Sequence, residues 1–516
     1  MKKIILTYGL LLSAVQTSAQ QNTLLIQSYF KDQLFNNART EVYVGSSFLP
    51  LLESDYNLNT IIRDSSIQYY DFTEVLFKRH LLDATGENYK LTISPIVDFS
   101  KSKDFNDTAN PSLFQNTRGL FIEGDLLKNF SFMTSVYENQ SRFNQYETSY
   151  YSSLGEMYPQ GSNYVTQNAV IPGAGRTKPF KEGGFDYAYA IGNIVYRPIR
   201  SVALIAGNSS QFIGDGHRSL LLSDNSVAAP FFRVDYKISS KWEFNFLRSK
   251  LFNLMRRPVS TTVEAYYETK GYSVNYLTYK PANSLSISLF EGIIWSKGDS
   301  ITSTNVHPLF YNPLPLVSGL IMSKEKVNTL YGLNLSFALK SNHRLYGQIG
   351  FSNLSIKNSA LQIGYRGYNY FGLTDFMLQL EYNNVAESTY NSSVNRLNYS
   401  AYNLPMAHVK GNAFQEILIR SSYSYKRMYI DLKTNYFLLN NYNSGSLLPV
   451  DKQSQKVDGS VLLTQLEFGY RFNKLINLSL FASWLLRNEH SDLIDLTTNQ
   501  FSIGLRTGIL NHYNDF

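Results

Sequence analysis

The chain contains no cysteine in its 516 residues. It therefore has no disulfide, no thiolate metal site and no cysteine nucleophile. Charged residues are also scarce, at 17% of the chain, and the lysines and arginines behind the formal net charge of +7 are scattered rather than gathered into a stripe. A nucleic-acid partner is not expected, because recognition of a phosphate backbone needs such a stripe.

Long apolar runs and catalytic motifs are missing too. Beyond the N-terminus no apolar run reaches the roughly 18 residues that a membrane-spanning helix needs. The motifs H-E-x-x-H, G-x-S-x-G and G-x-x-x-x-G-K-[ST] do not occur, and most of the seven histidines stand alone. We therefore expect no enzyme, no bound metal and no cofactor.

The N-terminus has the pattern of a secretory signal peptide over residues 1–19. Lys2 and Lys3 precede an apolar run, and small residues at 17–19 suit a cleavage site. No cysteine follows that site, so a lipoprotein anchor is not expected. The mature chain is predicted to begin near Gln20 and to be exported.

Tyrosine and phenylalanine are abundant, with 39 and 33 copies against 3 tryptophans. An exported, tyrosine-rich chain of modest hydrophobicity fits a secreted all-β protein or a transmembrane β-barrel. Barrels place such rings at both membrane interfaces, where one end of the ring is apolar and the other is wet. The chain also ends in Phe516, and a terminal aromatic residue is common in outer-membrane barrels.

From residue 89 onward the hydrophobic period is two. In the segment 332–339 large apolar residues occupy the odd positions, whereas Gly, Asn, Ser and Ala occupy the even ones, and 465–472 and 501–509 alternate in the same way. Segments of about 10 residues with an apolar and a polar face, joined by alternating short and long connections, are typical of outer-membrane barrels. We predict an antiparallel transmembrane β-barrel of about 18 strands over residues 89–516.

Residues 20–88 have a different pattern. Apolar residues recur at close to helical spacing near 24–34 and again near 72–82, with a turn-rich piece between them. We predict a small helical element here, either a plug of the barrel or a periplasmic cap.

The segment 214–219 gathers two glycines, an acid, a histidine, an arginine and a serine. In an extended strand Asp215, His217 and Ser219 would stand about 6.5–7 Å apart per step, too far for a nucleophile to bond its base. A tight turn could still bring two of them together. We favour a structural interpretation in which Gly214 and Gly216 shape a turn folded into the barrel. Asp215, His217 and Arg218 would then belong to a polar network or bind a ligand.

A second candidate site is the long connection that contains residues 144–165, which is dense in Tyr, Asn, Gln and Ser. Sugars are bound by flat aromatic faces and a few directed polar groups, so Tyr150, Tyr151, Tyr158 and Tyr164 are candidate glycan contacts. Arg176 could meet an acidic polymer. An ordinary solvent-exposed loop with scattered charge is the alternative.

These segments carry a resemblance to a known family. The stretch GNSSQFIGDGHRSLLLSDNSVAAPFFRVDYK, 207–237, resembles the signature of the capsule-assembly Wzi-like barrels, and in particular their gliding-motility RemB-like subgroup. Residues 116–126, 171–196, 307–315 and 402–416 match in the same order. The resemblance implies an 18-stranded outer-membrane barrel that binds capsular polysaccharide or supports surface motility. The partners implied are outer-membrane lipid, surface polysaccharide and other outer-membrane or motility proteins.

The sequence thus favours a non-catalytic outer-membrane barrel that binds or anchors surface polysaccharide and supports adhesion or gliding. A porin-like channel and an accessory subunit of a larger export or uptake complex are the alternatives. Whether the lumen is open or filled distinguishes a porin-like channel from a barrel that binds polysaccharide. Small inward residues such as Gly332, Asn334 and Ser336 would permit an open channel, whereas loops folded into the lumen would close it.

Overall fold

The structure is a computed structural model. It describes residues 23, 25–37, 47–52, 72–107, 112–127, 129–161, 163–256, 267–297, 306–322, 324, 326–340, 342–450 and 455–516. The predicted signal peptide, 1–19, and most of the turn-rich piece between the two predicted helical segments, namely 38–46 and 53–71, lie outside these residues. None of the described helices is long and apolar enough to cross a membrane.

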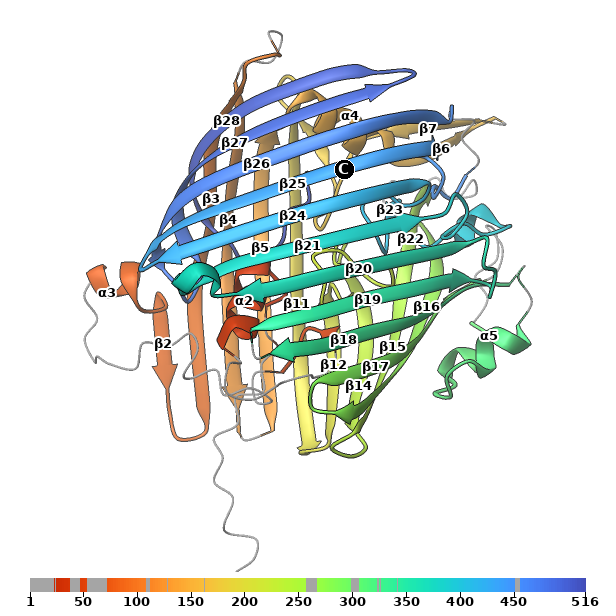
Figure 1. Ribbon diagram of the computed structural model, residues 1–516, viewed down its shortest axis with the longest axis horizontal. Helices are drawn as coiled ribbons and strands as arrows, with labels where there is room; N and C mark the ends of the chain where they lie inside the picture. The colour runs from red at the N-terminus through yellow and green to blue at the C-terminus, as the bar shows by residue number, and fades with distance from the viewer. Residues whose placement is uncertain are drawn as a thin grey trace, which may run out of the picture.

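Eighteen antiparallel strands of the described chain close into one barrel, as the sequence predicted (Figure 1). They are β3 (Tyr89–Asp104), β4 (Leu113–Leu126), β5 (Phe130–Arg142), β11 (Gly184–Ile199), β12 (Val202–Ser209), β14 (Ala229–Lys237), β15 (Trp242–Arg256), β16 (Tyr267–Ala282), β17 (Leu285–Trp295), β18 (Val327–Lys340), β19 (His343–Ser352), β20 (Ser359–Tyr368), β21 (Phe376–Val385), β24 (Phe414–Tyr425), β25 (Met428–Tyr442), β26 (Val457–Asn473), β27 (Leu478–Ser491) and β28 (Asp495–Thr507). The strands pair in meander order, and β28 pairs with β3 to close the ring. Closure pairs every edge, which a strand surrounded by lipid requires.

The remaining elements lie in the connections and at the N-terminus. The helices are α2 (Ser28–Asn37), α3 (Phe72–Phe77), α4 (Gln145–Ser153), α5 (Val317–Ile321), η3 (Pro308–Tyr311), η4 (Tyr370–Gly372) and η5 (Asn395–Leu397). The short strands are β1 (Phe48–Leu49), β2 (Leu82–Thr85), β6 (Glu156–Gln160), β7 (Asn163–Gln167), β8 (Val170–Ile171), β9 (Gly175–Arg176), β10 (Lys178–Phe180), β13 (Phe212–Ile213), β22 (Ser400–Ala401) and β23 (Leu404–Pro405).

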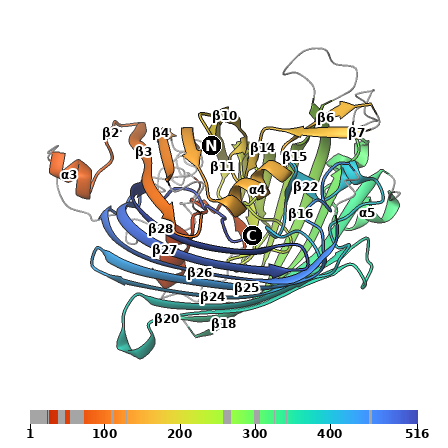
Figure 2. The ribbon, with the colours of Figure 1, turned by 90° about the horizontal axis from the view of Figure 1, so that it is seen from above.

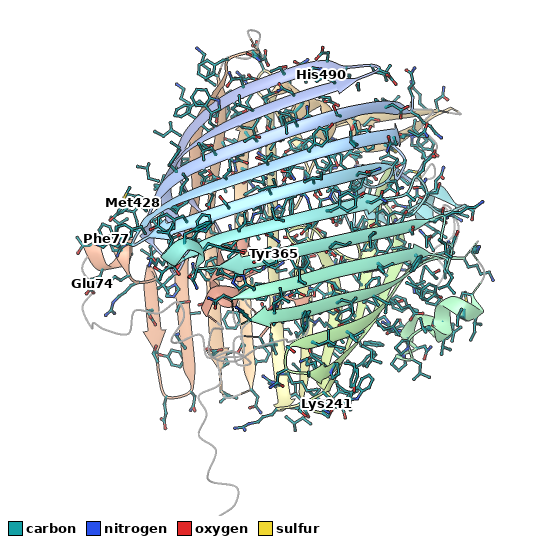
Figure 3. All side chains as sticks on the ribbon, in the orientation of Figure 1. Glu74, Phe77, Lys241, Tyr365, Met428 and His490 are labelled. Carbon is teal, nitrogen blue, oxygen red and sulfur yellow. The ribbon has the colours of Figure 1, made fainter. Side chains whose placement is uncertain are left out.

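The two rims of the barrel differ in the length of their connections. At one rim, the short-turn rim, two residues join β11 to β12 and two join β24 to β25. The opposite rim, the long-loop rim, carries the connections 143–183, 210–228 and 386–413. Figure 3 shows Lys241 and Met428 on the short-turn rim and His490 toward the other. This is the arrangement expected of an outer-membrane barrel.

The two faces of the wall follow the predicted alternation. On β18, Leu333, Leu335 and Phe337 point outward and are about 40% exposed, at 40%, 41% and 41%. Asn334 and Ser336 between them point inward and are buried. The outward band is therefore apolar and the inward face polar.

The lumen beside β15–β18 is filled rather than open. Leu220 and Leu221, from the connection 210–228, are fully buried in one apolar cluster with inward-facing Tyr272, Tyr276 and Phe290. A Cβ placed on Gly332 would overlap Leu221, so the small inward residue makes room for the loop instead of lining a channel. The leucines do not lead directly into a strand, since β14 begins only at Ala229.

The described N-terminal residues lie in two places. Helix α2 sits within the barrel, where Lys31 Nζ donates to the carbonyl of Gly216 at 2.8 Å and Asp32 pairs with Arg420 on β24. Helix α3 lies outside the wall in both views, at the short-turn rim (Figure 1, Figure 2). There Asn473 Nδ2 donates to the carbonyl of Arg79 at 2.8 Å.

The C-terminal residues 508–516 also turn into the lumen (Figure 2). Phe516 is 3% exposed and belongs to no strand. Its ring packs against Tyr150 and Tyr151 of α4, so the terminal aromatic residue is an interior contact here and does not lie on the last barrel strand.

Candidate functional site

The connection 210–228 folds inward and is held by a short strand pair. β13 pairs with β1 of the N-terminal region, and Ile213 N–H donates to Leu222 O at 2.8 Å. Gly214 follows with φ of +130°, a conformation that side chains rarely adopt, and a Cβ there would overlap Gln348 Nε2. A Cβ on Gly216 would lie 2.7 Å from Glu381 Oε2. A side chain at either position would collide with neighbouring atoms, so both positions favour glycine.

Replacing Gly214 by alanine is expected to lower the free energy of unfolding by about 1–3 kcal/mol, because the Cβ meets both backbone strain and Gln348. Gly173→Ala is the matched control, since Gly173 has φ of +76° but nothing within 4 Å of its Cβ position. Urea unfolding of the detergent-folded proteins measures both. Equal losses at the two sites would show that the contact with Gln348 has no energetic weight.

Asp215 is fixed by several donors inside the barrel. Its Oδ1 lies 2.8 Å from Arg344 Nη1, and its Oδ2 accepts from Ser47 Oγ at 3.0 Å. Arg366 donates to its backbone carbonyl at 2.7 Å. Burial alone raises the pKa of Asp215, but the nearby cations Arg344 and Lys31 hold that pKa below its usual range. Asp215 therefore anchors the loop as a carboxylate at neutral pH.

Arg218 is the centre of a buried ionic cluster. Its Nη2 lies 3.1 Å from Glu416 Oε1 on β24 and 3.0 Å from Asp515 Oδ2 of the C-terminal tail. Lys433 on β25 pairs with the same Asp515 at 2.8 Å. The backbone N–H groups of 217 and 218 donate to the Glu381 carboxylate at 2.9 and 3.2 Å. We call Arg218, Glu381, Glu416, Lys433 and Asp515 the Arg218 cluster.

Mutual attraction keeps Arg218 and Asp515 ionised. Burial lowers the pKa of Arg218, but the carboxylates of Asp515 and Glu416 outweigh it, and the net pKa is raised. The same attraction, chiefly from Arg218, holds the pKa of Asp515 below its usual range despite burial. The cluster joins the in-folded loop, the wall and the C-terminal tail through charged contacts, which are strong only while all partners are present.

His217 is a neutral member of this environment. Burial lowers its pKa well below the usual value, and the cations Arg420 and Arg218 lower it further. Its Nε2 lies 4.0 Å from Asp515 Oδ2, and the ring faces a cavity in the lumen.

The side chains of Asp215, His217 and Ser219 do not form a catalytic group. Asp215 bonds Arg344 and Ser47, and Ser219 Oγ donates to the carbonyl of Ile213. Asp215 and Ser219 are thus committed to different partners, and His217 Nε2 hydrogen-bonds neither of them. Among the described residues there is likewise no group of three or more His, Asp or Glu residues placed to hold a metal ion.

A second part of the lumen, along β25–β28 and β3–β5, is polar and hollow. It contains a cavity of about 330 Å³ whose walls include Gln115, Arg142, Lys433 and Gln500. A smaller cavity of about 90 Å³ adjoins it toward the short-turn rim and shares Arg420, Asp431, Glu467 and Arg506 with it. Helix α2 and the C-terminal tail border this half of the lumen.

Two of the four candidate tyrosines lie inside the barrel. Tyr150 stacks on Phe516 with ring centroids 3.9 Å apart, and its hydroxyl donates to Val409 O at 3.1 Å. Tyr151 is 4% exposed. The expectation of an exposed loop is therefore wrong for these two residues. Their helix α4 folds inward because its aromatic side pairs with the chain end.

The other candidates lie on the long-loop rim. Tyr164, on β7, is 40% exposed, and Tyr158, on the paired strand β6, is half-buried. Arg176 donates to Tyr267 Oη at 3.0 Å and pairs with Glu156 at 3.3 Å. A second arginine, Arg256, pairs with the same carboxylate at 2.7 Å, and its guanidinium lies 5.4 Å from the Tyr158 ring centre.

The chemistry of this rim group suits an acidic, ring-shaped ligand. Two arginines face one carboxylate, so the group carries one excess positive charge. Burial raises the pKa of Glu156, but the hydrogen bond from Tyr267 and other donors bring it below the usual value, so the carboxylate stays charged. Tyr158 lies on the same face of the hairpin as Glu156 and adds an aromatic ring to these charges, whereas Tyr164, opposite Pro159, lies on the other face.

Several structural partners were missed from the sequence. The C-terminal tail, Glu381, Glu416 and Lys433 carry no local pattern that marks them as an ionic cluster. One usable signal existed: strand alternation stops near Ile509, which leaves LNHYNDF outside the barrel strands. A polar and aromatic tail that is not a strand has to find partners elsewhere in the fold.

The fold resembles solved outer-membrane barrels. Wzi of Escherichia coli, described as a carbohydrate-binding β-barrel involved in group 1 capsule assembly, is 12% identical with a TM-score of 0.54, and the match covers 95% of this chain and 100% of Wzi. The chain has the Wzi-like barrel fold. OccK7 (OpdD) of Pseudomonas aeruginosa and a BenF-like porin of Pseudomonas fluorescens are 9% and 12% identical, with coverage of 81% and 82% of this chain and 99% of each of theirs, and TM-scores of 0.42.

No protein-family model and no curated protein matches the chain. At such low identity the likeness to Wzi establishes the fold and no more. The predicted Wzi-like barrel is confirmed at that level. The RemB-like subgroup remains a prediction.

Proposed function

We propose that this protein is a non-catalytic outer-membrane barrel that binds surface polysaccharide at its long-loop rim. The observation that carries the proposal is the occupied lumen. Leu220 and Leu221 fill one half with an apolar core, and α2 and the tail border the other. Such a barrel offers ligands a structured surface at its long-loop rim and leaves little space for solutes to cross the lumen. Wzi, which shares the fold, is itself described as carbohydrate-binding.

The rim group around Glu156 is the proposed contact for the glycan. The ring of Tyr164 is accessible for stacking on a sugar, and Arg176, elsewhere on the same rim, keeps a side-chain exposure of 28%. Stacking against sugar faces together with a directed cation is a common way to bind acidic polysaccharide. Arg176 is thus proposed to select for carboxylated or phosphorylated sugars.

Tyr164→Ala is expected to weaken binding of polysaccharide purified from the same cells roughly fivefold, because one aromatic contact contributes about 1 kcal/mol. Tyr236→Ala is the control: Tyr236 has nearly the same exposure, 41% against 40%, but lies on barrel strand β14 near the short-turn rim. Titration calorimetry on detergent-folded protein measures both. Absence of saturable binding, or an equal loss in the control, would contradict a glycan site at this rim.

A porin-like channel is a second candidate, and the polar half of the lumen is the observation that favours it. The two adjoining cavities reach from residues of the short-turn rim, such as Asn477, toward Arg142 near the long-loop rim. Solutes larger than ions and water would have to displace α2 or the tail. Conductance measurements decide between the two candidates.

The other predictions made from the sequence are part of the same proposal. We propose that residues 1–19 are a cleaved signal peptide, that 20–88 form a plug or periplasmic element, and that 89–516 form the barrel in the outer membrane. Support of adhesion or gliding motility, and association with other outer-membrane or motility proteins, follow from the resemblance to the RemB-like subgroup. Mass spectrometry of the mature N-terminus and membrane fractionation test the first part directly.

A further inference from the structure

The connection between β17 and β18 differs in composition from the other long connections. Its central segment, residues 306–322, reads VHPLFYNPLPLVSGLIM and contains no Asp, Glu, Lys or Arg, and the other described residues of the connection include Lys297, Lys324 and Lys326 on either side of it. The central segment includes η3 and α5. We call it the apolar flap. Loops that face water are usually polar, so this composition calls for another environment.

The apolar flap lies on the outer surface of the barrel wall. Alternate residues of a strand share a face. On β18, Leu333 points outward and is 40% exposed, yet Tyr331 and Val327, which share its face, are only 5% and 2% exposed. The flap covers them: a Cβ placed on Gly319 of α5 would overlap the Tyr331 hydroxyl. Both views place α5 outside the wall (Figure 1, Figure 2).

The wall beneath the flap is polar. Arg248 on β15 shares its face with Trp242, which is 40% exposed on the outer surface. Arg248 Nη2 donates to Asn275 Oδ1 at 3.1 Å, and Asn275 Nδ2 donates to Glu291 Oε2 at 2.9 Å. All three are buried. A bare cation on the lipid side of a barrel costs about 2–4 kcal/mol at mid-membrane, so a cover that also hydrogen-bonds it is favourable.

The flap is fastened to this polar patch through its backbone. Arg248 Nη2 donates to Asn312 O at 2.7 Å, and Arg248 Nε donates to Phe310 O. The Phe310 ring packs edge-to-face on Trp295 with centroids 6.0 Å apart. Ser318 Oγ closes the flap on itself by donating to Leu309 O at 3.0 Å. The polar atoms are thus turned toward the wall.

The side chains that face away from the wall are apolar except for His307. The large apolar exposed ones are Tyr311 (67%), Leu314 (60%), Val317 (36%), Leu320 (64%) and Ile321 (65%). A contiguous apolar patch of this kind marks a membrane or protein contact. It continues directly from the outward apolar band of β18, since α5 covers Tyr331 and Leu333 is the next outward residue. Exposed Lys324 and Lys326 follow the flap at the rim.

We propose that the apolar flap lies within the outer leaflet of the membrane, with lipid acyl chains covering Leu314, Leu320 and Ile321. The flap replaces a polar stretch of barrel wall by an apolar surface, and Lys324 and Lys326 mark the level of the anionic headgroups. The inference rests on the membrane placement in the proposed function and is independent of glycan binding.

Because the chain has no native cysteine, a single introduced cysteine can be labelled at a chosen position. Leu320→Cys carries a nitroxide label, and the full-length protein is reconstituted into phosphatidylcholine–phosphatidylglycerol vesicles. Collision with oxygen, which concentrates in acyl chains, is compared with collision with a water-soluble nickel complex. Leu335→Cys on the bare strand is the lipid control and Tyr164→Cys on the rim hairpin is the water control, with exposures of 41% and 40%. Ile321→Cys serves as a second probe of the flap.

We expect the ratio of oxygen collision to nickel collision at Leu320 and Ile321 to match the ratio at Leu335 and to exceed the ratio at Tyr164 several-fold. A ratio equal to that of Tyr164 overturns it, as does shielding from both reagents, which would indicate a protein partner or a second copy on the flap. If Leu335 also reports water, the membrane placement itself fails. If Leu335 reports lipid and only the flap does not, the flap inference alone fails.

Discussion

Arg218→Met should unfold far more easily than the native protein, by about 3–5 kcal/mol, because it removes the cation and leaves buried carboxylates uncompensated. Glu416 and Asp515 both have fully buried side chains and both bond the Arg218 guanidinium. Methionine preserves most of the side-chain volume, so the loss reports on charge rather than on a cavity. Thermal unfolding in detergent, followed by heat-dependent migration on gels, measures it.

Two comparisons make the Arg218 result specific. Lys456→Met breaks an ion pair with Glu387 whose side chains are 57% and 46% exposed, and such a pair contributes only about 0–1 kcal/mol. Arg218→Lys keeps the charge but loses the planar fork that reaches two carboxylates at once, so an intermediate loss is expected. Similar losses for Arg218→Met and Lys456→Met would show that the Arg218 cluster is not what holds the loop in place.

Deletion of residues 510–516 should produce steady ion conductance in a planar bilayer where the full-length protein shows none. The tail holds the centre of the lumen through Asp515, and Tyr513 Oη donates to Asp224 of the in-folded loop at 2.6 Å. Phe516 closes the space beside α4. Without these residues the cavity of about 330 Å³ would widen along the polar wall of β25–β28.

The tail experiment also decides between binder and pore. Asp515→Asn keeps the length of the tail and removes only its charge, so brief openings rather than a steady current are expected. Heat-dependent gel migration confirms that each variant retains a folded barrel. Steady conductance by the full-length protein would favour the porin-like alternative. A silent deletion variant would show that α2 and the loops seal the lumen without the tail.

The barrel itself was predictable because its signal is local. On β18 and β28 large apolar residues alternate with small or polar ones, and that period of two is imposed by strand geometry wherever one face meets lipid. The alternation of short and long connections and the change of pattern near residue 89 can also be recognised from residues that are close together in the sequence. The turn at Gly214 and Gly216 was also readable, since two glycines on either side of an aspartate are typical of a tight turn.

The candidate site was predicted only in part. Asp215, His217 and Arg218 were recognised as a polar group of an inward turn, but nothing near them indicates Glu416 or Asp515. Tyr150 and Tyr164 look alike in the sequence, in one loop rich in tyrosine. The structure stacks the first on Phe516 inside the barrel and leaves the second at the rim, because an aromatic ring packs against whichever partner the fold brings to it.

What the sequence alone determined about this protein is the wall: a chain of alternating strands that must close to satisfy its backbone in lipid. Only the tertiary structure decided which segments fill the lumen and which segment covers the outer face of the wall. The link between Arg218 and the tail joins residues 297 positions apart, and the apolar flap reaches Arg248 on β15 from the connection between β17 and β18. Such contacts depend on which side chains meet after closure, and ion pairs and packing at that range leave no periodic trace in the chain.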